Sequence, residues 1–187
     1  MPPRPKYSRE AVLDAAVEVA RRDGLGAVSA RSVAKALSSS TAPVSSYFDS
    51  MQALSEAVVD RIIERLIAYV DASAGDDPLA AASLAFARFT RDEPRLYESL
   101  FLTPHASEPD WVGLRRRFAR DLGDSPPYAA LGARARDAAA WRAVVVTHGI
   151  CIEIWSGRWT KTDDASLRRL VDDLVMPVVA AFLDQRG

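Results

Sequence analysis

The chain has 187 residues, enough for one substantial core or for a small domain joined to a larger one. Its 24 Lys and Arg side chains nearly balance its 25 Asp and Glu side chains, so the total charge does not indicate a polyanionic partner. A lone cysteine, Cys151, excludes an internal disulfide, and no apolar run has the length of a membrane span or the form of a signal peptide. We therefore expect a cytoplasmic protein that does not enter a membrane.

Apolar residues at helical spacing predict an all-α fold of about nine helices, and no segment alternates as a strand would. The first predicted helix spans residues 9–23, because Ser8 is suited to cap its N-terminus and Gly24 to end it. The apolar residues of this segment repeat every three or four positions, so one face of the helix is expected to be buried.

Residues 29–48 are predicted to form two short helices separated by a serine-rich turn. Ser29 is expected to cap the first helix and Ser40 the second, because a serine hydroxyl accepts a hydrogen bond from an amide of the first helical turn. Pro43 then lies near the third helical position, where its missing N–H costs nothing. The proline therefore indicates a helix start and not an interruption.

The rest of the chain is predicted to be helical, with a long helix that begins after Ser50 and ends near Gly75. The next helices are expected to begin at Asp77-Pro78 and at Glu93-Pro94. The remaining predicted segments are a helix at 108–122, a linker at 123–128 and two long helices at 131–157 and 163–185.

The last two predicted helices are too apolar to lie on a solvated surface. On a helical wheel the earlier one has apolar residues on two opposite sides, with Arg142 and Glu153 in a narrow polar strip. A partner subunit would cover one of these sides. Two such helices from each of two chains would form a four-helix bundle with two-fold symmetry, so we expect a homodimer through the last two helices.

The two short helices at 29–48 have the spacing of a helix-turn-helix, in which the second helix enters the DNA major groove. Small side chains in its first turn let the backbone approach the base pairs closely. Ser40 and Thr41 have hydroxyls for phosphates or base edges, and Ala42 and Pro43 present apolar groups to thymine methyls. Arg31 has the two-donor geometry that reads a guanine edge.

These residues resemble the signature of TetR-family transcriptional regulators, which extends here from about Tyr7 to Leu54. The matched positions are Val12, Leu13, Ala15, Ala16, Gly24, Ser29, Val33, Ala34, Leu37, Ser40, Thr41, Val44, Tyr47, Phe48, Ser50 and Leu54. An ordinary helical hairpin would share the spacing of 29–48 but not so many matched positions. The resemblance implies an all-α homodimer with a DNA-binding domain at 1–54, which includes three helices, and a ligand-binding and dimerisation domain at 55–187.

The resemblance also implies the roles of individual residues. The positions that face bases are Arg31, Thr41, Ala42 and Pro43. The positions that face the DNA backbone are Ser29, Ser40, Ser45, Ser46 and Tyr47. The partners that it implies are a double-stranded, pseudo-palindromic operator and a small-molecule effector, with a homodimeric repressor released from DNA by that effector.

The chain departs from the family pattern at four positions. Ser38 and Ser39 stand where Gly-Val is common, Ser45 replaces a tyrosine that often binds phosphate, and Met51 replaces a lysine. Two positioning contacts are thus absent, which predicts weaker binding to every DNA sequence. The N-terminal arm, with Arg4, Lys6 and Arg9, offers cations that compensate. The alternative function is therefore a helical ligand-binding or interaction protein of the same architecture with weak or lost DNA binding.

Other side chains suggest an effector site, although each also fits ordinary core packing. The candidate effector-binding residues are Phe89, Tyr97, Phe101, Trp111, Phe118, His148 and Trp155. Two histidines and one cysteine give no metal-ligand spacing, so we expect no metal and no cofactor. We identify no nucleophile–base pair and no phosphate loop, so we do not expect an enzyme.

Overall fold

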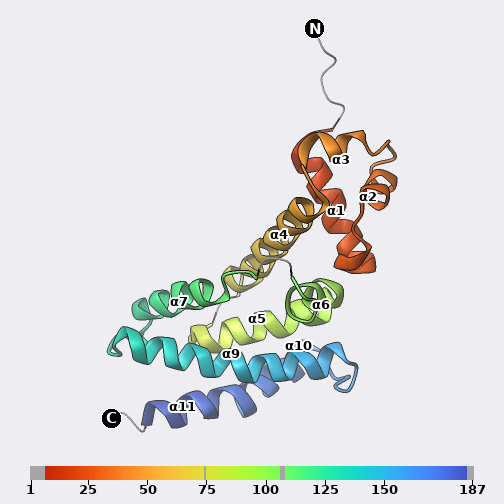
Figure 1. The fold of residues 1–187 in the computed structure, drawn as a ribbon. Coiled ribbons are helices and arrows are strands. Elements are labelled where there is room, and N and C mark those ends of the chain that lie inside the picture. Colours follow the sequence, from red (N-terminus) through yellow and green to blue (C-terminus); the bar gives the residue numbers. More distant parts are fainter. Residues whose placement is uncertain (1–6, 74, 106–107, 185–187) are drawn as a thin grey trace. The chain divides into compact units, whose positions relative to one another are not determined.

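The structure is a computed structural model, and it describes residues 7–73, 75–105 and 108–184. The described residues are helical and contain no strand, which confirms the all-α prediction (Figure 1). They form two compact units. The first unit comprises residues 1–65 and 93–109, and the second comprises 66–92 and 110–187, in each case as far as they are described. The predicted arm residues Arg4 and Lys6 lie outside the described residues.

The first unit contains the three N-terminal helices, the beginning of a long helix and one later short helix. Its elements are α1 (Arg9–Asp23), η1 (Leu25–Ala27), α2 (Ala30–Ala36), α3 (Ala42–Tyr47), α4 (Met51–Asp71) as far as Arg65, and α6 (Pro94–Phe101). The predicted ends of α1 are confirmed. The Ser8 hydroxyl accepts from the Ala11 amide at 3.1 Å, and Gly24 ends the helix with a φ of 87°.

Helix α6 packs against α1 although 70 residues of chain separate them, and polar contacts fix its position. The buried Ser99 hydroxyl accepts from the Leu25 amide at 3.2 Å and donates to the carbonyl of Arg95 at 2.7 Å. Arg21 lies 3.9 Å from Glu93. The compact unit therefore includes residues 93–109 and extends along α4 beyond the predicted boundary at residue 54.

Arg61 joins α4 to α1 within the first unit. Its guanidinium donates to the carboxylates of Glu10 and Asp14 on α1, and it also pairs with Glu64 one turn along α4. One cation thus holds two acidic side chains of a neighbouring helix. Buried apolar side chains such as Leu54 and Val58 line the same stretch of α4.

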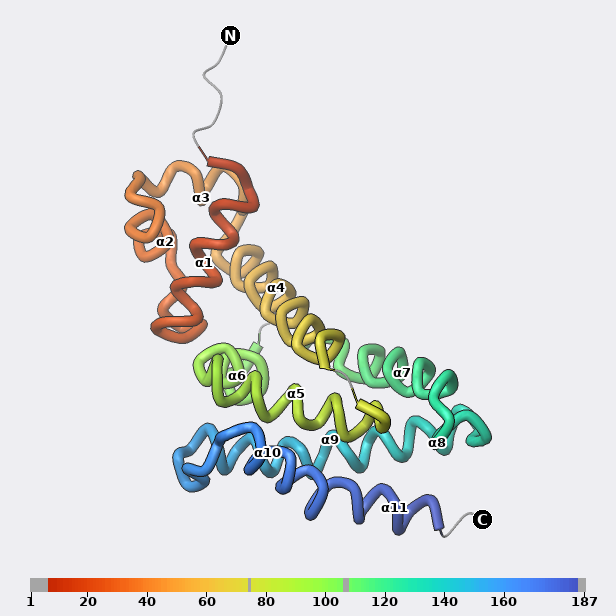
Figure 2. The backbone as a smooth tube through the Cα atoms, turned by 180° about the vertical axis from the view of Figure 1, so that it is seen from behind, coloured from red at the N-terminus to blue at the C-terminus, as the bar shows by residue number. Residues whose placement is uncertain are grey.

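The second unit is built around one long central helix. Its elements are the end of α4, α5 (Pro78–Asp92), α7 (Trp111–Asp121), η2 (Leu122–Asp124), α8 (Pro126–Ala129), α9 (Ala133–Trp155), α10 (Asp164–Leu170), η3 (Val171–Val175) and α11 (Met176–Asp184). Helix α9 packs against α5, α7 and α11, and these helices lie side by side along it (Figure 2). The core of this unit is formed mainly by small and aliphatic side chains of α9 and of the chain from Leu167 to Phe182.

The segment 123–128, predicted as a linker, is not an irregular loop, because η2 ends in it, α8 begins in it, and Tyr128 anchors it to the core. Leu122 and Tyr128 are each only 1% exposed. The Tyr128 hydroxyl donates to one carboxylate oxygen of Asp77 at 2.7 Å, while the other oxygen of Asp77 accepts the amides of Leu79 and Ala80 and so caps α5. Burial and the neighbouring carboxylate raise the pKa of Tyr128, so the phenol remains a donor.

The last predicted helix, 163–185, begins as expected but is not one regular α-helix, and residue 185 lies outside the described residues. The Asp163 carboxylate accepts from the Ser166 amide at 3.0 Å and caps α10. The wider π-helical segment η3 separates α10 from α11. This segment and the one-turn helix α8 explain why the helix labels reach α11 although about nine helices were predicted.

Helix α9 combines buried small residues with exposed large ones. It is the one described helix that is long and apolar enough for a membrane span by length and composition, and 39% of that stretch is buried within the unit. On the exposed side of α9, Trp141 is 51% and Val145 50% exposed, and on η3 and α11, Leu174 is 47% and Val178 41% exposed. We call these four residues the exposed apolar face.

Polar contacts also occur inside the second unit. Arg88 and Arg91 of α5 both donate to the Asp164 carboxylate at the start of α10, at 2.7 and 2.8 Å. These guanidinium groups hold the pKa of Asp164 below its usual value.

Cys151 is fully buried on α9, and its burial raises the pKa of the thiol to about 12. The cysteine is therefore a neutral core side chain at physiological pH.

Candidate nucleic-acid interface

Helix α2 begins with a reciprocal pair of hydrogen bonds. The Ser29 hydroxyl accepts from the Ser32 amide at 3.1 Å, and the Ser32 hydroxyl accepts from the Ser29 amide at 2.9 Å. The predicted cap at Ser29 is confirmed. The role of Ser32 was not predicted, because glutamate or glutamine usually supplies the second half of such a capping box. The Ser29 hydroxyl is thus occupied at the start of α2.

The turn after α2 places a serine in the left-handed region. Ser38 has a φ of 50° and is the only described residue other than glycine with a positive φ. The Ser38 amide donates to the Lys35 carbonyl at 3.1 Å and the Ser39 amide to the Ala34 carbonyl at 2.9 Å, the two bonds of a Schellman motif. The backbone at the Gly-Val position of the family is therefore kept, although Ser38 introduces a Cβ penalty of about 1 kcal/mol.

Helix α3 starts one residue later than predicted. Its N-cap is Thr41, whose side chain makes no capping hydrogen bond, so the predicted cap at Ser40 is wrong. The Ser39 hydroxyl donates to the Ser40 carbonyl at 2.8 Å, which orders the chain just before the helix. Pro43 lies in the first turn, as expected, because it needs no N–H there. Ser40, Thr41 and Ala42 are all exposed.

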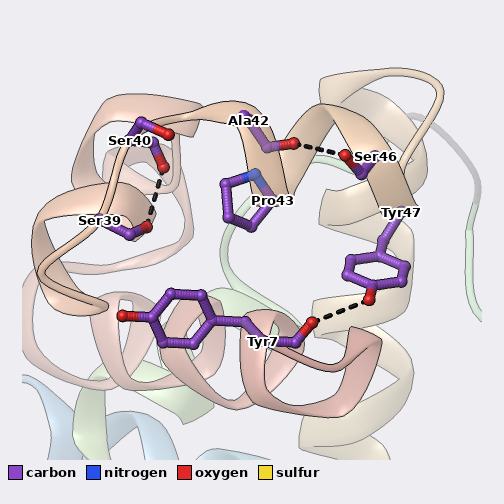
Figure 3. A pocket seen from close by; sticks show the side chains of 7 residues that line it. All are labelled: Tyr7, Ser39, Ser40, Ala42, Pro43, Ser46 and Tyr47. Carbon is purple, nitrogen blue, oxygen red and sulfur yellow. Dashed lines mark hydrogen bonds between the residues drawn. The ribbon is translucent and has the colours of Figure 1, made fainter. Parts of the chain in front are cut away.

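A hollow of about 370 Å³ lies beside the start of α3. It is lined by Tyr7, Ser39, Ser40, Ala42, Pro43, Ser46 and Tyr47. Figure 3 shows the Pro43 ring near its centre, with the two serines of the turn on one side and Ser46 and Tyr47 on the other. Five of the nine predicted DNA-contacting residues line this hollow, and none of the described lining residues is a cation.

Two tyrosines tie the start of α1 to the other helices of the motif. The Tyr47 hydroxyl donates to the Tyr7 carbonyl at 2.8 Å (Figure 3), and the Tyr7 hydroxyl donates to the Leu37 carbonyl at 2.8 Å. We call these two bonds the tyrosine bridge. They connect residues 30 and 40 positions apart in the sequence. The chain just before α1 is thereby held against α3, and this role of Tyr47 was not predicted.

The hydroxyls of Ser45 and Ser46 are turned back onto their own helix. Both donate to the Ala42 carbonyl, at 3.1 and 2.8 Å. A serine hydroxyl has a single proton, so a phosphate that needs a donor must displace this bond. Together with Tyr47, three of the residues that the resemblance places toward the DNA backbone therefore have their donors engaged within the protein.

The cations around the motif lie outside α3. Arg31 and Lys35 are exposed on α2 and form no ion pair with any described residue. The Arg9 guanidinium lies over the Phe48 ring at 4.9 Å from its centroid. Met51, at the family's lysine position, is 40% exposed. Arg31 and Lys35 are therefore the side chains with a charge available for a polyanion.

The candidate effector residues are distributed over both units. Tyr97 and Phe101 belong to the first unit, whereas Phe89, Trp111, Phe118, His148 and Trp155 belong to the second. Phe89 and Tyr97 are fully buried, and Trp155 is 37% exposed. His148 meets the Phe86 ring edge-on, and its burial lowers its pKa. These contacts also fit core packing, so the effector role of the seven residues stays a prediction.

The described residues contain no group of three or more His, Cys, Asp or Glu side chains that could hold a metal ion. The acidic side chains near Arg61 are held by that cation, and the two histidines are far apart in sequence.

Comparison with protein families gives a match for the helix-turn-helix region. Residues 12–58 match the family described as bacterial regulatory proteins, tetR family, a range that covers most of α1, all of α2 and α3, and the first turns of α4. The N-terminal domain is that of a tetR-family regulatory protein. The family match ends at Val58, four residues beyond the predicted domain boundary.

Solved structures agree with this result at the level of the fold. One of them is a variant of TetR from Acinetobacter baumannii AYE in complex with minocycline, which is similar with a TM-score of 0.60 and 18% sequence identity. The match covers 97% of this chain and 99% of that chain. The tetR-like architecture therefore extends over both units. A search of curated proteins gave no match.

Proposed function

We propose that this tetR-family protein is a homodimeric transcriptional regulator that binds a pseudo-palindromic DNA operator and is released from it by a small molecule. The observation that carries the proposal is the exposed leading edge of α3, formed by Ser40, Thr41 and Ala42 within a domain of the tetR family. Small exposed residues at the start of a second helix suit close approach to base pairs. The protein acts by binding in the cytoplasm, without a cofactor and without catalysis.

Each DNA contact follows from the chemistry of the side chain. Arg31 reads a guanine edge with two donors, while Ala42 and Pro43 meet apolar edges such as thymine methyls. Thr41 makes no capping bond, so its hydroxyl is available to a base edge or a phosphate. Lys35 adds a charge for the phosphate backbone. The tyrosine bridge positions the start of α1 beside these contacts.

The exposed apolar face supports the homodimer. Trp141 and Val145 of α9 and Leu174 and Val178 of η3 and α11 expose large apolar surface, whose burial is favourable. A second copy that presents the same face forms an isologous four-helix interface. A two-fold dimer also places one reading helix on each half of the operator.

Release by an effector is supported by the minocycline complex of the structural relative. Helix α4 begins in the DNA-binding unit and ends in the second unit, so its residues belong to both. An effector that favours one arrangement of the second unit shifts α4 and thereby the separation of the two reading helices. This is the behaviour of a repressor that loses its operator when the effector binds.

The test is a gel-shift titration with the DNA that flanks the protein's own gene, at low salt. We expect retardation of a fragment with two half-sites about one helical turn or a multiple of it apart. The variant Arg31→Ala tests the same fragment with one reading side chain removed. Absence of any shift at low salt, with folded protein, would contradict the proposal.

The alternative is a ligand-binding protein of the same fold with weak DNA binding. It is favoured by the engaged hydroxyls of Ser45, Ser46 and Tyr47 and by Met51 in place of a lysine. The double variant Ser45→Tyr with Met51→Lys restores both family contacts and distinguishes the two functions. A large gain from almost no binding supports the alternative, whereas a modest gain with a salt slope steeper by about one supports the regulator.

A further inference from the structure

A second hollow, of about 380 Å³, lies in the second unit and is lined by residues of α8, η3 and α11. Its lining is mostly apolar and comprises Pro127, Tyr128, Met176, Pro177, Val179, Ala180 and Leu183, with the two carboxylates Asp77 and Asp172. We call it the acidic groove. None of the seven candidate effector residues lines it, so it is separate from the effector site expected from the sequence.

The walls of the acidic groove are fixed by the contacts around Tyr128. The buried Tyr128 ring is held by its hydrogen bond to Asp77, and Asp77 in turn caps α5. Opposite, Met176 and Val179 lie one turn apart on α11, and Val179 belongs to the core of the unit. The groove therefore has a rigid apolar floor, which suits the hydrocarbon part of a ligand.

The two carboxylates of the groove are not equivalent. Both oxygens of Asp77 accept hydrogen bonds from within the protein. Asp172 is exposed on the π-helical segment η3 and forms no ion pair with any described residue. Among the described residues, no Lys, Arg or His side chain lines the groove. Asp172 thus presents a negative charge at the rim of an apolar surface, with no compensating cation in the lining.

The apolar floor and the exposed carboxylate of Asp172 together favour one class of ligand. A carboxylate attracts a cation, and the apolar floor favours a ligand with a hydrocarbon body. A metal ion does not suit the groove, because the described residues offer no third acidic or imidazole ligand there. An anionic ligand would meet the uncompensated charges of Asp77 and Asp172.

We propose that the acidic groove binds an amphipathic organic monocation, with its ammonium group beside Asp172 and its apolar body over Met176, Val179 and Leu183. The ligand class follows from the groove alone. This binding does not depend on DNA, and Leu174 and Val178 of the exposed apolar face do not line the groove.

Three probes with the same hydrocarbon body test the proposal by calorimetric titration in the absence of DNA. They are 4-phenylbutylamine, 4-phenylbutanol and 4-phenylbutyrate, whose end groups are cationic, neutral and anionic. We expect the amine to bind about fivefold more tightly than the alcohol, the size of a partly solvated ion pair, and the carboxylate to bind least.

The variant Asp172→Asn should bring the affinity for the amine down to that for the alcohol. The matched control is Asp173→Asn, which removes the neighbouring exposed carboxylate outside the groove lining and should leave all three affinities unchanged. The variant Ala180→Trp fills the groove and should abolish binding of every probe, with its thermal unfolding checked for an intact fold.

Several results would overturn the proposal. They are equal affinities for amine and alcohol, an amine preference that survives Asp172→Asn, equal losses in the Asp172 and Asp173 variants, or no binding of any probe at millimolar concentration. Binding that persists in a folded Ala180→Trp variant places the probe elsewhere and has the same consequence. Because DNA is absent from the titration, these outcomes are independent of the gel-shift result.

Discussion

The two units of the protein are stabilised in different ways. In the first, short helices are joined by specific hydrogen bonds at their ends, such as the tyrosine bridge and the contact of Ser99 with the Leu25 amide. In the second, long helices pack through apolar side chains, and large ones remain exposed on α9 and α11. The short helices α2 and α3 bury only Val33, Ala34 and Val44 of their own residues, so polar contacts help to fix their orientation.

The first unit is fixed by contacts within itself, whereas the second unit exposes apolar surface that a partner could bury. The hydrogen bonds of the first unit define the positions of α1, α2 and α3 within the unit itself. The exposed apolar face of the second unit leaves favourable burial unused, which a second copy of the chain would complete. Variants in the two units should therefore differ in kind. Those in the second unit change assembly, and those in the first change DNA affinity or stability.

The largest effect is expected for Val178→Glu, which places a charge in the exposed apolar face. An unpaired buried carboxylate is unfavourable, so the variant should be monomeric and should bind the full operator roughly 100-fold more weakly, because one half-site provides only part of the contacts. Analytical ultracentrifugation and gel-shift titration measure the two effects. The control Arg168→Glu adds a charge change on exposed α10 and should remain dimeric. A dimeric Val178→Glu variant would refute the predicted interface.

A smaller loss is expected for Arg31→Ala, because the Arg31 side chain forms no ion pair with any described residue. Removing a two-donor contact to a guanine should weaken specific binding by about 1–3 kcal/mol and relax the preference at one base pair. Fluorescence anisotropy with single-base-substituted operators measures both. Arg22, which pairs with Asp23 at 2.6 Å, provides the control Arg22→Ala. Equal effects of the two variants would show that Arg31 does not read a base.

The variant Ser38→Gly should stabilise the protein by about 1 kcal/mol, because glycine adopts the left-handed conformation without a Cβ penalty. Denaturant unfolding measures the gain. Ser40→Gly, two residues later and at a negative φ, should give no gain. A loss of stability in Ser38→Gly would mean that the serine side chain makes a compensating contact.

The smallest effect is expected for Tyr47→Phe, which removes one hydrogen bond of the tyrosine bridge and keeps the ring. The free energy of unfolding should fall by about 0.5 kcal/mol, since the bond is only partly buried. Tyr7→Phe removes the other bond and should have a similar effect. If Tyr47→Phe leaves stability unchanged but weakens DNA binding, the hydroxyl serves the phosphate and not the bridge.

Local signals in the sequence predicted much of the fold. Ser8, Ser29 and Ser50 cap helices as expected, because capping depends on residues within one turn. The segment 123–128 was mistaken for a linker, since its Gly, Ser and Pro residues are typical of exposed turns. Its attachment to the core depends on the hydrogen bond of Tyr128 to Asp77, 51 residues away. A contact over that distance leaves no periodic signal in the chain.

In the candidate interface, too, local features were predicted but contacts between residues far apart in the sequence were not. The helix-turn-helix followed from spacing and from the family signature, and the left-handed Ser38 occupies the position at which the family commonly has glycine. The tyrosine bridge was not predicted, because nothing local indicates that Tyr47 donates to the Tyr7 carbonyl. The acidic groove was also not predicted, since Asp77 and Asp172 come together only through the packing of α5 against η3.

The burial of Cys151 makes its rate of alkylation a measure of local opening in the second unit. It is the sole cysteine of the chain, so a thiol reagent has one target, and that target is fully buried on the central helix of the second unit. Thiolate is the reactive species, and it is scarce when the pKa is about 12, so alkylation must await opening of the helix packing. The labelling rate of the unaltered protein therefore reports how often the second unit opens.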